Sequence, residues 1–213
     1  MKKNLTELVF ILDRSGSMAG LESDTIGGFN SMLEKQKKLE GEAVLTTVLF
    51  DDKYEVLHDR ISLNAAAPIT DNDYFVRGST ALLDAVGLSI LKTEKNCRHT
   101  SAEFLPDKVM FIITTDGMEN ASTEFTYEKI HKMITEKKEK ENWEFIFMGA
   151  NIDAVQTAQS FGIPESRAVK FRSDKKGTSL NYEVMSELAS AFRDGEEISE
   201  DWKKRIDEDM KNR

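Results

Sequence analysis

The sequence contains a single cysteine, Cys97, in 213 residues, and long apolar runs are also missing. One thiol cannot form a disulfide within the chain, so a reducing cytoplasm is the expected location. The first residues include two lysines but no apolar stretch of signal-peptide length, and no segment approaches the length of a membrane span. We therefore expect a cytoplasmic protein that does not interact with a membrane.

Basic charge is in short supply as well. Lysine and arginine total 29 against 38 aspartates and glutamates, which gives a formal net charge of -9 and a pI near 5.0. Nucleic-acid backbones and anionic membranes require clustered basic residues, so neither is expected as the main partner. The three histidines lie in unrelated segments and give no ligand pattern. A cation or a basic protein surface fits this composition better.

What the chain does have is enough apolar material for one sizeable core. Hydrophobic residues make up 39% and charged residues 31%, which is typical of a soluble globular protein. No linker, internal repeat or low-complexity tract divides the sequence. We expect one domain over residues 1–195, followed by a terminal amphipathic helix over residues 196–213.

Apolar runs alternate with helical patterns along this domain. The run at residues 8–12 is bounded by turn-forming residues and suits a strand buried on both faces, as do residues 109–115 and 143–148. Residues 44–50 and 54–61 predict a hairpin, and residues 168–171 a last strand. Helices are expected at 22–39, 79–95, 127–141, 154–161 and 180–192. This order predicts an α/β fold, Rossmann-like with three α/β/α layers, in which one edge strand of a mostly parallel sheet is antiparallel.

Two helical segments leave alternatives open. Gly27 and Gly28 weaken the helix at residues 22–39, so either they permit close approach to the sheet or the predicted boundary is wrong. In the terminal segment, apolar residues recur every four positions and Ser199 is a candidate cap. The segment is expected to pack on the domain, and a partner surface is the alternative. The apolar stripe consists of Ile198, Trp202, Ile206 and Met210.

Oxygen-bearing side chains follow the first apolar run. In "LVFILDRSGSMAG", Asp13, Ser15 and Ser17 occupy alternate positions, and Gly16 lets the loop curl so that they converge. Carboxylate and hydroxyl oxygens suit Mg²⁺ or Mn²⁺, whereas Zn²⁺ favours Cys and His. Further ligands are available in two other loops, where Thr80 lies in "RGSTALLDA" and Asp116 in "FIITTDGMENAS". Loops of this kind meet at one edge of a parallel sheet, which predicts a shared metal site.

A purely structural alternative exists for each motif. The serines and Asp13 could cap the next helix, Thr80 could cap the helix that starts at Ala81, and Asp116 could hold its own turn. Asp84 could accept a hydrogen bond from a ligand or lie in solvent.

Taken together, the three motifs resemble the metal-ion-dependent adhesion site (MIDAS) of von Willebrand factor A domains, of the standalone bacterial or phage type. The resemblance covers residues 5–190 and implies that Ser15, Ser17 and Thr80 ligate Mg²⁺ or Mn²⁺ directly. It implies that Asp13 and Asp116 act directly or through water. It also implies a protein-binding module and not an enzyme, with an Asp or Glu of a partner protein completing the metal shell.

Two other functions compete with this one. A scaffold could bind through its terminal helix. A Mg²⁺-dependent hydrolase of the haloacid dehalogenase type needs a second Asp where Ser15 stands, and "SGSMAG" does not match the G-x-S-x-G elbow.

Residues Met18, Met118 and Glu119 are candidates to shape the rim of the site.

Overall fold

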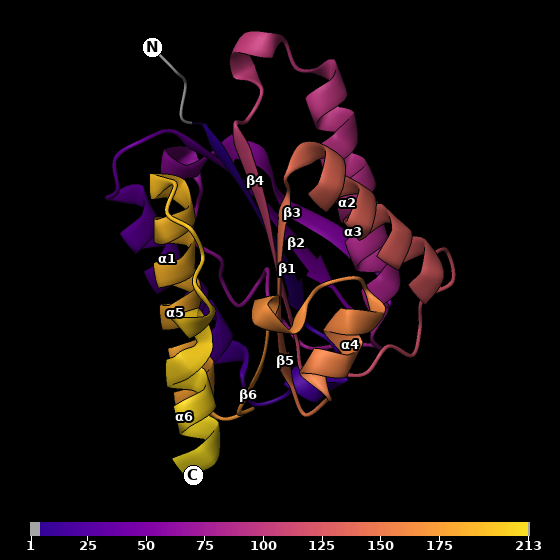
Figure 1. Ribbon diagram of the computed structural model, residues 1–213. Helices are drawn as coiled ribbons and strands as arrows, with labels where there is room; N and C mark the ends of the chain where they lie inside the picture. Colours follow the sequence, from indigo (N-terminus) through magenta and orange to yellow (C-terminus); the bar gives the residue numbers. More distant parts are fainter. Residues whose placement is uncertain (1–4, 213) are drawn as a thin grey trace.

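Strand β1 (Thr6–Asp13) lies in the middle of the sheet in the computed structural model, which describes residues 5–212 (Figure 1). All eight of its residues are buried. Successive side chains point to opposite faces of a strand, so alternate residues enter two separate cores. Both faces of the sheet therefore have to be covered, as the continuous apolar run predicts.

The sheet has six strands in the order β3-β2-β1-β4-β5-β6. Strands β2 and β3 pair antiparallel, and all other neighbouring pairs are parallel. The predicted sheet with one antiparallel edge strand is thus confirmed. The strands besides β1 are β2 (Ala43–Phe50), β3 (Tyr54–Ser62), β4 (Lys108–Thr115), β5 (Glu144–Ala150) and β6 (Ala168–Phe171).

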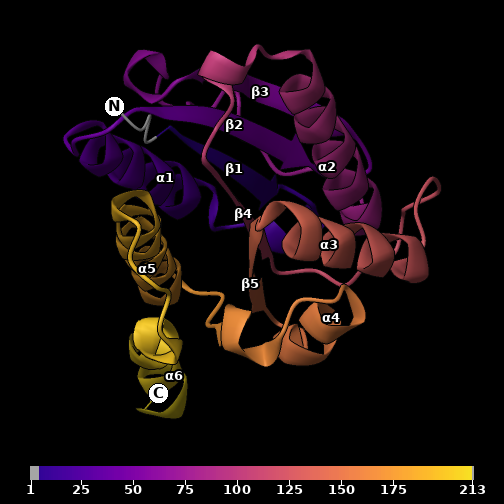
Figure 2. The same ribbon diagram turned by 45° about the horizontal axis from the view of Figure 1, so that its top comes forward.

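Helices form a layer on each face of this sheet (Figures 1 and 2). One layer contains α1 (Glu22–Lys37), α5 (Lys175–Asp194) and α6 (Lys204–Asn212). The other contains α2 (Leu82–His99), α3 (Tyr127–Glu141) and α4 (Ala154–Ser160). Short 3₁₀ turns cover Gly16–Met18, Leu63–Ala65, Ala102–Phe104, Glu165–Arg167 and Glu200–Lys203. Within residues 5–212, no helix combines the length and the apolar character that a membrane span needs.

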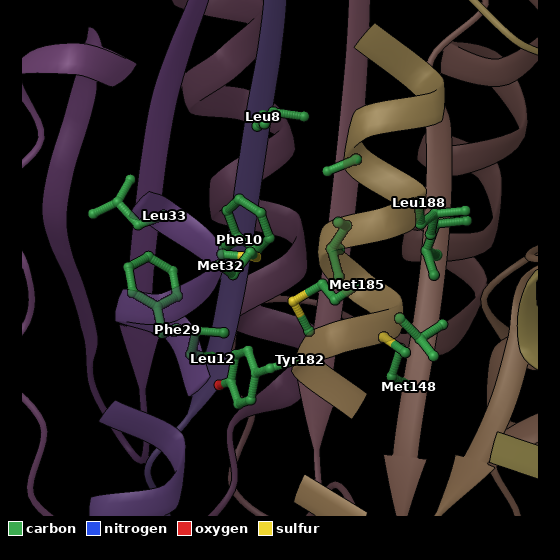
Figure 3. Close-up of a cluster of buried hydrophobic side chains, with 14 of the residues drawn as sticks. Leu8, Phe10, Leu12, Phe29, Met32, Leu33, Met148, Tyr182, Met185 and Leu188 are labelled. Atoms are coloured by element: carbon green, nitrogen blue, oxygen red, sulfur yellow. The ribbon is translucent and has the colours of Figure 1, made fainter. Parts of the chain in front are cut away.

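Helices α1 and α5 pack closely against each other, and α1 packs on β1 through the rings of Phe29 and Phe10, whose centres are 5.7 Å apart (Figure 3). Gly28 explains the closeness of the two helices, because a Cβ atom at that position would overlap the ring of Tyr182. The expected close approach to the sheet is therefore wrong for Gly28, which permits close approach to helix α5 instead. The shared core includes Leu8, Phe10, Leu12, Phe29, Met32, Leu33, Met185 and Leu188.

Helix α2 begins three residues later and ends four residues later than predicted. Two further predictions are also wrong. Helix α5 begins at Lys175, five residues before the predicted start, because Asp174 caps it by accepting a hydrogen bond from the main-chain N–H of Gly177 at 2.8 Å. The terminal segment is not a single α-helix, since the 3₁₀ turn Glu200–Lys203 precedes α6. Ser199 stands at the start of that turn but makes no capping hydrogen bond with its side chain.

The terminal segment packs on α5 and β6. Ile198 and Ile206 are buried, and Trp202 Nε1 donates to the carbonyl of Ser166 at 2.8 Å. The guanidinium of Arg172 donates to main-chain carbonyls near the end of α6. The division into a domain of residues 1–195 and a separate terminal helix stays a prediction.

Two residues outside the predicted site, Cys97 and His58, have side chains that can bind a metal in other proteins. Cys97 is half-buried on α2, and burial raises the pKa of its thiol to about 11. The ring of His58 lies between Thr47 Oγ1 at 2.9 Å and the carbonyl oxygen of Ala67 at 3.0 Å, and burial lowers its pKa. Neither is placed to serve as a metal ligand.

Candidate metal centre

The loop that follows β1 is organised by the carboxylate of Asp13. Its Oδ1 accepts a hydrogen bond from the main-chain N–H of Ser15 at 2.6 Å, and its Oδ2 accepts one from Thr115 Oγ1 at 2.6 Å. The serines do not cap a helix, because α1 starts after Leu21, and Ser15 makes no capping bond to its 3₁₀ turn. The capping alternative for this motif is therefore wrong.

Three hydroxyl groups converge beside this loop. Ser15 Oγ lies 3.1 Å from Ser17 Oγ and accepts a hydrogen bond from Thr80 Oγ1 at 3.0 Å. Thr80 does not cap α2, whose N-cap residue is Ala81. The two loops are also joined through their main chains, since the N–H of Gly16 donates to the carbonyl of Gly78 at 3.2 Å. Ser15 and Thr80 are buried, whereas Ser17 is exposed, so the cluster opens to solvent on one side.

Gly117 leaves space among the three hydroxyls. A Cβ atom at this position would lie 2.8 Å from Thr80 Oγ1, 2.9 Å from Ser17 Oγ and 3.5 Å from Ser15 Oγ. All three oxygens therefore face the same small volume. A side chain at residue 117 would fill it.

Asp116 directly follows β4 and is 2% exposed. The two oxygens of its carboxylate differ in their hydrogen bonding. Its Oδ2 accepts hydrogen bonds from Ser173 Oγ at 2.7 Å and from Asn151 Nδ2 at 3.3 Å. Its Oδ1 is buried and has no hydrogen-bond partner among the described residues. A buried carboxylate oxygen without a partner is costly, and a cation at this position would offset that cost. No hydrogen bond holds the Asp116 side chain in its own turn.

The electrostatics of the cluster favour a cation. Within residues 5–212, no lysine, arginine or histidine forms an ion pair with Asp13 or Asp116. Burial raises the pKa of Asp13, and the negative charge of Asp116 raises it further. A bound cation would relieve both effects, because it stabilises the ionised carboxylates.

The donor set fits a hard cation. It consists of carboxylate and hydroxyl oxygens, which suit Mg²⁺ or Mn²⁺. In the part of the chain that the structure describes, no group of three or more His, Cys, Asp or Glu side chains is placed to hold a metal. A cation here would depend on the neutral hydroxyls for much of its shell.

Several supporting residues do not follow from the motifs alone. Thr115 orients Asp13, while Asn151 and Ser173 hold Asp116. Asn151 and Ser173 come shortly after β5 and β6, so the rule that ligands meet at the carboxyl ends of parallel strands could have found them.

One expectation about the rim and one about Asp84 are corrected. Met18 is buried at 2% exposure, so it cannot shape the rim, whereas Met118 is 73% exposed. Asp84 forms no hydrogen bond with a predicted metal ligand among the described residues, and its carboxylate is not merely solvated. Its carboxylate accepts hydrogen bonds from the main-chain N–H groups of residues 123–125 and fixes that loop.

No protein-family model matches the chain, and no curated protein sequence matches it either. Several solved structures, however, match the fold of the chain. A von Willebrand factor type A protein from Catenulispora acidiphila is 14% identical with a TM-score of 0.61, over 89% of this chain and 43% of that one. Proximal thread matrix protein 1 from the mussel byssus, with a zinc-occupied MIDAS motif, is 16% identical with a TM-score of 0.58, over 87% and 46%.

The pilus adhesin SpaC from Lactobacillus rhamnosus GG is 11% identical with a TM-score of 0.64, over 88% of this chain and 30% of the adhesin. The chain thus spans less than half the length of each of these proteins. At such low identities the likeness is one of fold. The resemblance seen in the sequence motifs is confirmed at that level, and the chain has the fold of a von Willebrand factor A domain.

Proposed function

We propose that the protein is a metal-dependent binding module, in which Asp13, Ser15, Ser17, Thr80 and Asp116 hold a divalent cation. The observation that carries the proposal is the buried, unpartnered Oδ1 of Asp116, next to a glycine that leaves space among three hydroxyls. Mg²⁺ and Mn²⁺ are the proposed metals. Zn²⁺ enters the test as well, because the mussel protein holds zinc at its motif.

The proposed role of the cation is to accept a carboxylate from a partner protein. Neutral hydroxyls leave much of the charge of a cation uncompensated, and this charge attracts an external anion. Asp or Glu of a protein partner supplies such an anion, whereas the net charge of -9 disfavours nucleic acid and anionic membranes. A cytoplasmic location is part of the proposal and is supported by the lone thiol. We propose no catalytic role.

Metal binding is tested by thermal unfolding of the EDTA-stripped protein with added Mg²⁺, Mn²⁺ or Zn²⁺. A cation that binds only the folded state adds about 2.7 kcal/mol of stability at a hundredfold excess over its dissociation constant. Ser17→Ala should lose this gain and still fold normally without metal, because the residue is exposed and, among the described residues, its hydroxyl forms a hydrogen bond only with Ser15 Oγ. Ser179→Ala, at an exposed position on α5, is the control and should keep the gain.

Asp116→Ala should abolish metal binding and still yield folded protein, because the residue lies at a strand end and not in an apolar core. An unfolded product would mean that Asp116 is a structural residue. A wild-type protein that no cation stabilises would contradict the proposed centre.

Carboxylate binding has its own test in the Mn²⁺-loaded protein. Acetate should reduce the enhancement of water proton relaxation, because it takes the place of water at the cation. Acetamide has a similar shape and no charge, so it should have no effect. Equal responses to the two probes would contradict the proposed recognition of a carboxylate.

A further inference from the structure

Asn120 forms hydrogen bonds with both main-chain polar groups of Thr80. The N–H of Thr80 donates to Asn120 Oδ1 at 2.9 Å, and the N–H of Asn120 donates to the carbonyl of Thr80 at 3.0 Å. The two residues are 40 positions apart in the sequence. Both main-chain polar groups of Thr80 are therefore bonded to Asn120.

The main chain next to Thr80 is bonded to other segments, since the carbonyl of Gly78 accepts from Gly16 and the N–H of Ala81 donates to Asp51, but among the described residues only Asn120 bonds the main chain of Thr80 itself. Thr80 lies outside regular secondary structure, between Gly78, whose φ of +66° is rare for other residues, and the first turn of α2. Its hydroxyl donates to Ser15 Oγ, so the position of that oxygen depends on where the main chain is held. A shift of the Thr80 main chain would carry the hydroxyl away from the cluster.

The loop that contains Asn120 is anchored independently of this residue. Glu119 Oε2 accepts a hydrogen bond from the N–H of Leu83 at 2.9 Å, and Ser122 Oγ accepts one from the N–H of Asp84 at 3.0 Å. These bonds cap the first turn of α2, which has no capping side chain of its own. The carboxylate of Asp84 in turn binds the N–H groups of residues 123–125. Removal of the Asn120 side chain should therefore leave the loop in place.

We propose that Asn120 is a positioning residue, which sets the Thr80 hydroxyl at the distance that a cation in the centre requires. This inference rests on the proposed function. Asn120 itself does not touch the cation. Its side-chain oxygen acts only through the N–H of Thr80, since its own N–H remains in any variant except proline.

The test is Mn²⁺ titration of the full, EDTA-stripped chain together with urea unfolding of each variant. Asn120→Ala should weaken Mn²⁺ binding by about tenfold or more, the usual result of losing a residue that orients a ligand. Asn120→Asp keeps an acceptor for the N–H of Thr80 and should restore most of the affinity. Asn30→Ala is the matched control, because the Asn30 side chain also holds a distant loop residue: its Oδ1 accepts from the N–H of Ile69 at 2.8 Å and its Nδ2 donates to the carbonyl of Ile69 at 2.9 Å.

The control should lose stability and bind Mn²⁺ as the wild type does. Two results would overturn the inference while the wild type still binds Mn²⁺. One is an unchanged affinity in Asn120→Ala, whether or not the added charge of Asn120→Asp tightens binding. The other is Asn120→Asp as weak as Asn120→Ala. A wild type that does not bind Mn²⁺ would remove the proposed function together with this inference.

Discussion

Arg14 and Ser15 are neighbours in the chain but belong to two opposite kinds of polar cluster. Arg14 is fully buried, and its guanidinium donates to Asp51 at 2.9 Å, to Glu55 and to the carbonyl of Asp73 at 3.1 Å. It also lies 5.2 Å from the ring centre of Phe75. Charges of both signs are present, so this cluster is complete within the protein.

The cluster on the Ser15 side contains two carboxylates and three hydroxyls but no cation among the described residues. This difference between the clusters changes the pKa values of two buried aspartates in opposite directions. Burial alone would raise the pKa of Asp51, but the hydrogen bonds that it accepts, led by that from Arg77, outweigh this effect and lower it. Asp13 accepts hydrogen bonds from uncharged groups and, among the described residues, from no arginine or lysine, so burial raises its pKa. A cluster built for stability brings its own counter-charge, whereas a cluster built for a ligand leaves that charge to be supplied.

The largest effect on stability is expected for Arg14→Met, which removes the buried cation and leaves Asp51 with only the partly exposed Arg77 as a counter-charge. Breaking a buried ion pair from one side costs about 3–5 kcal/mol. Urea unfolding in EDTA should show a loss of free energy of this size. A variant as stable as the wild type would mean that Arg14 does not supply the counter-charge that its cluster needs.

An intermediate effect is expected for Gly117→Ala. The new methyl group would enter the space among the three hydroxyls, and such overpacking costs about 1–3 kcal/mol without metal. The same group should also abolish stabilisation by Mg²⁺ or Mn²⁺. Gly27→Ala is the control, because a Cβ atom there meets no neighbouring atom. Retention of the metal effect in Gly117→Ala would place the cation elsewhere.

The smallest effect is expected for Arg77→Ala. Its Nε also donates to Asp51, at 2.7 Å, but its side chain is partly exposed. Water screens such a pair, so the loss should be far below that of Arg14→Met and should shrink further in high salt. Equal losses in the two variants, measured by urea unfolding, would show that burial does not distinguish the two arginines.

The sequence predicts the framework of the fold well, because continuous apolar strands and the hairpin are local patterns. The start of α5 was missed because Asp174 acts as a cap ahead of any apolar repeat. The terminal segment was predicted as one helix because its apolar spacing stays helical through the 3₁₀ turn.

At the candidate centre, the three motifs and their common edge could be predicted from strand ends followed by oxygen-bearing side chains. The pairs that their hydrogen bonds form could not be predicted, because the strand-end rule marks Asn151 and Ser173 as candidates without saying which side chain each one bonds. Thr115 lies 102 positions from Asp13, and Ser173 lies 57 positions from Asp116. No spacing in the sequence encodes such contacts, since they arise only when the strands assemble side by side.

The single thiol makes the centre convenient to follow with a chemical label. Thiolates react with alkylating reagents, and at a pKa of about 11 the side chain of Cys97 forms very little thiolate near neutral pH. Met118 is 73% exposed and directly follows Gly117. A Met118→Cys variant should therefore be modified much faster than the native cysteine, which makes a spin label or a fluorophore at the rim possible without first removing Cys97.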